Sequence, residues 1–223
     1  MPSPAQAHYQ RVTAQRESCA YADDTLVHAT GYELMLAKLA ADKRRLKSVQ
    51  SIELRADIKR ELLPEYVPYI EGVLASDGGV QDDVLMSVMV WRIDSGDGAG
   101  ALDIARYALE HGLTLPDQYQ RSTATLIAEE FADSAKRARD GNQGFEIAQL
   151  HAVAELTEPH DMPDEVRAKL YKELGLLTQN PGEALGLLQR AMQLNDKVGV
   201  KKDIEKLERE LKNAAQAQSN APA

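Results

Sequence analysis

The chain has 223 residues and a formal net charge of −9 at pH 7; 43% of its residues are hydrophobic but only 5% are aromatic. This length suits one large or two small domains, and a core built mostly from Leu, Ala, Val, Ile and Met favours helices over sheets. The composition excludes an intramolecular disulfide, because Cys19 is the only cysteine, and it offers neither a membrane span nor a signal peptide, so a cytoplasmic location is expected.

The first part of the chain is expected to be an arm followed by helices. Residues 1–30 are polar and lack periodicity, which predicts a flexible N-terminal arm. From Tyr32 onward the apolar residues recur with helical spacing. A second helix is expected over residues 52–63, where Pro64 and Pro68 should interrupt it before the helical pattern resumes.

Next comes a predicted helical hairpin. Asp82 and Asp83 stand at the start of an apolar helix, where the helix dipole favours acidic side chains. Gly96 is expected to end this helix, and Asp97 to cap the one that follows. The short turn between them predicts two antiparallel helices.

The second half of the chain also has the pattern of helices joined by short turns. Helical periodicity covers residues 126–139, 145–156, 161–177, 184–194 and 200–211. No segment shows sustained period-two alternation, so the sequence predicts an all-α protein of eight or nine helices in antiparallel hairpins. Four parts are expected: a flexible arm (1–30), a helical core with a basic N-terminal region (31–116), a helical domain ending in an amphipathic helix (117–212) and a disordered tail (213–223).

The C-terminal part resembles a single tetratricopeptide hairpin. Small residues, Gly175, Ala184 and Ala191 among them, recur where two helices of such a hairpin must approach closely. The loop is about three residues too short for that motif, and such folds need several repeats for stability. An unrelated helical hairpin is the simpler alternative.

The main candidate for a functional surface is a basic run in residues 38–60. Eight basic residues there accompany three acids, for a local net charge of +5. The eight are Lys38, Lys43, Arg44, Arg45, Lys47, Arg55, Lys59 and Arg60. Cations spaced along helices can contact successive phosphates of double-stranded DNA, and counterion release then drives binding without sequence readout. The alternative is an ordinary solvated helix surface whose charges pair with one another.

The densest group of acids surrounds the turn between the two hairpin helices. Asp94, Asp97 and Asp103 flank this turn and are the candidate catalytic residues. A magnesium-dependent nuclease needs carboxylates that converge on the ion. Helix capping by Asp97 and solvation of Asp94 are the stronger structural alternative, because acids favour the first turn of a helix in any case.

Other catalytic and metal-binding patterns are weak or missing. The triplet Asp57-Ile58-Lys59 is similar to a restriction-nuclease motif, but that motif works on a strand and this triplet lies in a helical stretch. The five histidines and Cys19 lack the spacing of a zinc site. No phosphate-binding GK[ST] loop, GxSxG elbow or HExxH motif is present. Mg²⁺ is therefore the only cofactor considered, and only if the chain is a nuclease.

Six stretches resemble one protein family. QDDVLMSVMVWRIDSGD (81–97) and GALDIARYALEHGLTLP (100–116) are similar to the signature region of the small terminase subunits of temperate, contractile-tailed phages, often described as terminase endonuclease subunits. The other stretches follow in the family's order: YELMLAKLAADKRRLK (32–47), KRELLPEYVPYIEGVL (59–74), DMPDEVRAKLYKELGLL (161–177) and VKKDIEKLERELK (200–212). The resemblance spans about residues 28–212, and 117–160 match least well.

This resemblance implies a role in phage DNA packaging. A member would recognise concatemeric phage DNA at the packaging site, in the host cytoplasm, and recruit the ATPase large subunit for cleavage and packaging. Small terminase subunits commonly act as homo-oligomers, often rings. The family description also implies an endonuclease, although no catalytic residues can be carried over. The alternative is a helical-repeat scaffold that makes protein–protein contacts and does not bind DNA.

Overall fold

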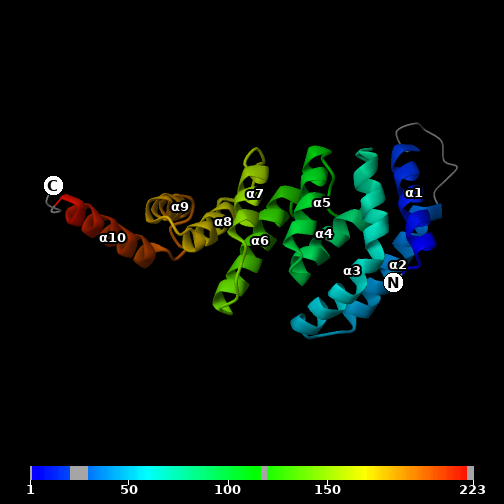
Figure 1. The fold of residues 1–223 in the computed structure, drawn as a ribbon, viewed down its shortest axis with the longest axis horizontal. Coiled ribbons are helices and arrows are strands. Elements are labelled where there is room, and N and C mark those ends of the chain that lie inside the picture. The colour runs from blue at the N-terminus through cyan, green and yellow to red at the C-terminus, as the bar shows by residue number, and fades with distance from the viewer. Residues whose placement is uncertain (1, 21–29, 117–119, 220–223) are drawn as a thin grey trace. The chain divides into compact units, whose positions relative to one another are not determined.

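The computed structural model describes residues 2–20, 30–116 and 120–219, and within these ranges every regular element is an α-helix (Figure 1). The helices are α1 (Pro4–Ala20), α2 (Thr30–Lys47), α3 (Ile52–Ser76), α4 (Asp83–Ser95), α5 (Gly98–Glu110), α6 (Thr123–Asp140), α7 (Ile147–Thr157), α8 (Asp164–Leu177), α9 (Pro181–Leu194) and α10 (Lys201–Ser219). The all-α prediction is confirmed, with ten helices in the described ranges instead of eight or nine. None of the described helices is both long and apolar enough to cross a membrane.

The chain divides into two compact units, residues 1–123 and 124–223. In the first unit α3 packs against α1, α2 and α4, and α5 packs against α4. In the second unit α8 packs against α7 and α9, and α10 packs against α9. In the first unit α3 is therefore the main packing partner, and in the second unit α8 and α9 each pack against two neighbouring helices.

Helix α3 is continuous, although an interruption at Pro64 and Pro68 was expected. Both prolines lie inside a single helix of 25 residues. Each removes a backbone donor, which ordinarily weakens a helix interior. Here α3 packs against three neighbouring helices, and Tyr66 and Ile70 next to the prolines are almost fully buried. Burial of this apolar surface compensates for the missing hydrogen bonds, as is usual when tertiary packing overrides local propensity.

Helix α1 occupies most of the segment expected to be a flexible arm. It lies against α3 at a point of very close approach, where a Cβ added to Gly72 would lie 2.3 Å from the backbone oxygen of Arg11 and 2.9 Å from the Cβ of Ala14. An ion pair between Arg11 and Glu71 spans 3.3 Å at the edge of this contact. Glycine is the only residue that permits this approach. Residues 21–29 of the expected arm, and 220–223 of the expected tail, lie outside the described residues.

The hairpin of α4 and α5 forms as its turn residues predict. Asp82 caps α4 by accepting a hydrogen bond from the backbone N–H of Leu85 (2.8 Å). Gly96 ends α4 in the left-handed conformation, with φ of 89°. Asp97 then caps α5 by accepting from the N–H of Gly100 (3.0 Å). Local sequence signals are sufficient here because each cap satisfies backbone groups within three or four residues of itself.

Two packing details hold the second unit together. A Cβ on Gly175 of α8 would lie 2.6 Å from a terminal methyl group of Leu188 on α9, so small residues do allow these helices to approach closely. The same Leu188 forms an apolar cluster with Val200 and Ile204, against which Leu207 of α10 packs. The apolar residues in the first half of α10 therefore pack inside their own unit.

Candidate nucleic-acid interface

The basic run of residues 38–60 covers parts of two helices that meet in a tight turn. Helix α2 ends at Lys47 and α3 begins at Ile52, so residues 43–55 form the end of a helical hairpin, which we call the α2–α3 tip. Ser51 caps α3 by accepting from the N–H of Leu54 (3.3 Å). The guanidinium of Arg55 donates to the backbone oxygen of Val49 (2.6 Å), which ties the turn to the first turn of α3.

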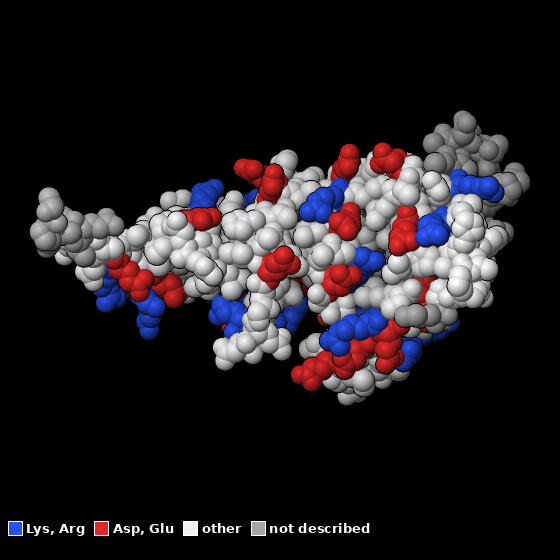
Figure 2. Space-filling view, viewed as in Figure 1, with Lys and Arg blue, Asp and Glu red and all other residues white. Residues whose placement is uncertain are grey.

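An acidic stripe on α3 neutralises part of the basic run. Four glutamates and aspartates recur at intervals of four residues, which places them on one face of the helix; they are Glu53, Asp57, Glu61 and Glu65. Arg45 pairs with Glu61 (3.1 Å), Lys38 pairs with Glu65 (2.8 Å), and Arg60 pairs with Asp57. Figure 2 accordingly shows acidic and basic side chains interspersed over this part of the first unit. The spacing was visible in the sequence, but only the fold shows that the stripe lies beside α2.

Lys38 is occupied by contacts inside the first unit. Its ammonium group lies 2.8 Å from Asp42 and from Glu65, and 4.7 Å from the ring centre of Tyr66. Burial lowers the pKa of Lys38, but the hydrogen bonds and charges of its two carboxylate partners outweigh burial and leave that pKa above its ordinary value. A lysine held in this way contributes more to packing of α2 on α3 than to contacts with a phosphate.

Lys59 and Arg60 are also held, in this case against the turn between α4 and α5. Lys59 forms an ion pair with Asp94, and Arg60 donates a hydrogen bond to the backbone oxygen of Ser95 (3.1 Å). Both contacts tie the first half of α3 to the end of α4. Of the eight predicted DNA-binding residues, four therefore have acidic partners inside the molecule.

The remaining four cations gather at the α2–α3 tip. Arg44 and Lys47 are exposed and have no ion-pair partner among the described residues. Lys43 is half-buried, and burial lowers its pKa while the nearby charge of Asp83 opposes this effect. Arg55 contacts the backbone oxygen of Val49 and forms no ion pair with a carboxylate of the described residues. Unpaired cations that stay in water are the ones available to replace the counterions of a phosphate backbone.

The three candidate catalytic acids each have another partner. Asp94 forms an ion pair with Lys59, whereas solvation of Asp94 had been expected as the alternative to a catalytic role. Asp97 caps α5 and lies 3.5 Å from Arg92, and Asp103 pairs with Arg106 one turn further on (3.1 Å). Their side chains face different partners instead of one shared point.

The described residues do not fit a magnesium site at this turn. Mg²⁺ is held by carboxylates that converge on one ion, together with water and substrate phosphates. Within residues 2–20, 30–116 and 120–219, no group of three or more His, Cys, Asp or Glu side chains is arranged to hold a metal ion.

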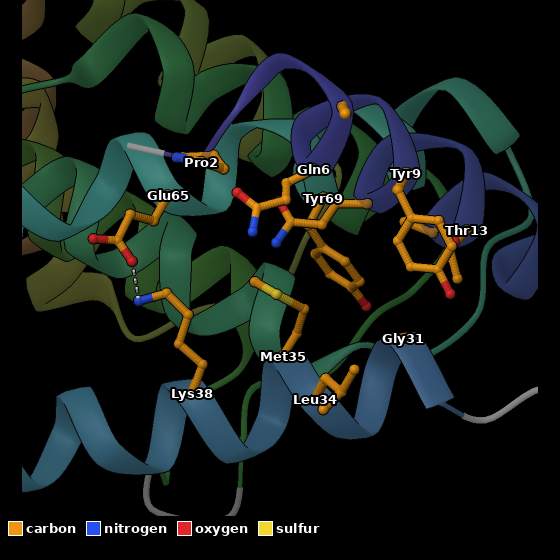
Figure 3. Close-up of a pocket in the computed structure, with 13 residues that line it drawn as sticks. Pro2, Gln6, Tyr9, Thr13, Gly31, Leu34, Met35, Lys38, Glu65 and Tyr69 are labelled. Carbon is orange, nitrogen blue, oxygen red and sulfur yellow. Dashed lines mark ion pairs between the residues drawn. The ribbon is translucent and has the colours of Figure 1, made fainter.

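A groove of about 620 Å³ lies between α1 and α2, with Tyr69 of α3 at its floor (Figure 3). Tyr9 of α1 and Leu34 of α2 border it and are 65% and 67% exposed. The charged groups at its edge, Lys38 and Glu65, are paired with each other. The described residues that line the groove thus offer a mainly apolar contact surface. Sequence reasoning missed it because α1 was expected to be flexible.

One buried acid lies close to the floor of this groove. The hydroxyl of Tyr69 donates to Asp82 (2.6 Å), which also caps α4 and is 5% exposed. Burial raises the pKa of Asp82, and the hydrogen bonds from Tyr69 and from the backbone oppose this change. Because Asp82 is satisfied on both oxygens, it serves the junction of α3 and α4.

Comparisons with known proteins give a consistent result. A family model described as phage small terminase subunit matches residues 36–165. The chain is 51% identical over 228 residues to "Terminase, endonuclease subunit" of Escherichia phage P2, across 99% of this chain and 90% of that protein. It is 24% identical over 207 residues to "Probable terminase, endonuclease subunit" of Haemophilus phage HP1, across 85% and 74% of the two chains. No solved structure matches it significantly. The matched family region contains the α2–α3 tip and the α4–α5 hairpin.

Proposed function

The chain belongs to the phage small terminase subunit family, and from this we propose that it recognises concatemeric phage DNA at the packaging site and recruits the ATPase large subunit for cleavage and genome packaging. The observation that carries this proposal is the 51% identity to the P2 terminase subunit over almost the full chain. We propose that double-stranded DNA binds at the α2–α3 tip, where Lys43, Arg44, Lys47 and Arg55 follow closely along the chain and form no ion pair among the described residues.

The charge arrangement supports the tip in preference to the whole basic run. The acidic stripe on α3 pairs with Lys38, Arg45 and Arg60, whereas Arg44 and Lys47 are exposed and form no ion pair among the described residues. Their charges stay available to the phosphates of a duplex that approaches the tip. All eight predicted residues belong to the proposed surface. Lys38, Arg45, Lys59 and Arg60 position the hairpin, and the other four contact DNA.

Replacing Arg44 and Lys47 together by alanine is expected to weaken binding of packaging-site DNA about tenfold at 0.1 M salt. The dependence of log K on log salt should become shallower by about 2, because two fewer counterions are released. The measurement is a salt titration of binding to a fluorescent duplex by the full-length chain. Thermal unfolding should not change, since both side chains are exposed.

A matched control variant removes two positive charges from another helix. Lys136 and Arg137 on α6 are exposed and have no ion-pair partner among the described residues. Their double alanine variant should bind DNA almost as the parent chain does. An equal loss in both variants would mean that overall charge, and not the tip, governs binding.

DNA cleavage is a separate question, because both relatives are named as endonuclease subunits. Asp94→Asn with Asp97→Asn is expected to leave magnesium-dependent cutting of packaging-site DNA by the complete terminase unchanged, since both carboxylates already hold other partners. Asparagine keeps the cap of α5. Loss of cutting with DNA binding intact would show instead that these acids, with Asp103, form the nuclease site and hold Mg²⁺.

We further propose that the chain works as a homo-oligomer, with a ring as the expected form. The apolar groove between α1 and α2 and the exposed residues 212–216 of α10 are available for contacts with other subunits. We keep the prediction that α8 and α9 resemble a tetratricopeptide hairpin, supported by the close approach at Gly175. The competing scaffold function is favoured by the acidic net charge. Absence of DNA binding by the parent chain at low salt would favour that alternative.

A further inference from the structure

The α2–α3 tip also carries unexpected apolar surface. Ile52 is 80% exposed, more than any other large hydrophobic side chain in the described residues, and Leu54 beside it is 50% exposed. Ile52 is the first residue of α3 and follows the capping residue Ser51. Single exposed apolar side chains are common, but here two occur within one helical turn at the end of a hairpin.

The charges around this apolar pair identify its partner. Arg44 and Lys47 close the preceding helix, and Arg55 lies one turn into α3. Within residues 43–55 the only acid is Glu53. An exposed apolar side chain near unpaired cations is suited to a polyanion whose interior is apolar. Duplex DNA is such a polyanion, because its charged phosphates lie outside its stacked bases. Proteins that bend DNA often insert Ile or Leu between base steps, with basic side chains on the flanking backbone.

The tip is rigid enough to act as a wedge. Leu46 and Ile58 are buried beneath it and fix the ends of the two helices. Arg55 ties the turn through the backbone oxygen of Val49, and the hydroxyl of Ser48 donates to the backbone oxygen of Arg45 (2.7 Å). A side chain presented on such a support loses little conformational freedom on binding, which favours insertion.

We propose that Ile52 inserts between base pairs of duplex DNA and bends it, while Arg44, Lys47 and Arg55 contact the phosphates on either side. This inference rests on the proposed DNA-binding function and adds a mode of recognition to it. Sites whose base steps unstack easily would then be preferred without any hydrogen bond to a base edge. Glu53 faces the same phosphates and opposes binding.

The test uses the full-length chain and a duplex of about 30 base pairs from the packaging site, labelled at both ends for energy transfer; bending brings the ends together. The parent chain should raise the transfer efficiency. Ile52→Ser with Leu54→Ser should abolish this rise and lower affinity about tenfold, with an unchanged salt dependence, because no phosphate contact is lost. Glu53→Gln should strengthen binding about threefold by removing one repulsive charge.

Met192→Ser serves as the control, because Met192 is also an exposed apolar side chain (36%) but lies on α9, in the other unit. It should leave bending intact. If the parent chain binds DNA without bending it, the wedge is wrong and the proposed function stands. If the parent chain binds no DNA at low salt, both fail. If the serine variant keeps bending but forms smaller oligomers in light scattering, the apolar pair is a contact between copies and the wedge is wrong.

Discussion

Replacing Arg139 by alanine is expected to lower the free energy of unfolding of the 124–223 unit by about 3 kcal/mol. Arg139 at the end of α6 donates two hydrogen bonds to Glu173 of α8, at 3.0 and 3.2 Å. The side chain of Glu173 is only 1% exposed. Removal of the guanidinium leaves a buried carboxylate without its cation, and burial of an unpaired charge costs far more than loss of a surface ion pair.

The measurement for Arg139→Ala is urea unfolding of the full chain, combined with amide hydrogen exchange in α6 and α8. Lys206→Ala is the matched control in the same unit, because its 3.9 Å pair with Glu210 is solvent-exposed; it should cost less than about 1 kcal/mol. Arg139→Met with Glu173→Leu should recover much of the lost stability, since an apolar pair leaves no buried charge. A double variant as unstable as Arg139→Ala would contradict this account.

Gly72→Ala is expected to destabilise the docking of α1 on α3 by roughly 1–3 kcal/mol. The added Cβ would lie 2.3 Å from the backbone oxygen of Arg11, and backbone cannot move aside as a flexible side chain can. The same change ordinarily stabilises a helix interior, because alanine is the better helix former. The energetic cost of the clash should therefore exceed the stabilisation that alanine gives the helix. As a result, α1 should separate from α3.

Hydrogen exchange in residues 4–20 measures this separation directly. Gly186→Ala is the control, since Gly186 also lies inside a helix but its added Cβ would meet no atom within 4 Å. That variant should be more stable than the parent chain by about 0.5–1 kcal/mol. Faster exchange in α1 for Gly72→Ala alone is the expected result. Unchanged protection of α1 in that variant would show that the two helices are not in fixed contact.

The amino-acid sequence by itself determined the features whose causes are local. Asp82, Gly96 and Asp97 satisfy backbone groups within a few residues of themselves, so the α4–α5 hairpin could be predicted from its turn. The same holds for the all-α class, which follows from composition and periodicity. The family could be recognised because its matching stretches are long and occur in order.

Only the tertiary structure decided which residues meet across helices. It showed that α3 continues through two prolines, that α1 docks at Gly72, and that the acidic stripe of α3 faces part of the basic run. It also showed that Ile52 at the tip is exposed to solvent. The energies of these features depend on distances between segments far apart in the chain, and spacing along a single helix carries no information on those distances. A cation in the sequence is therefore a candidate for DNA binding, and the fold decides whether a neighbouring carboxylate already holds it.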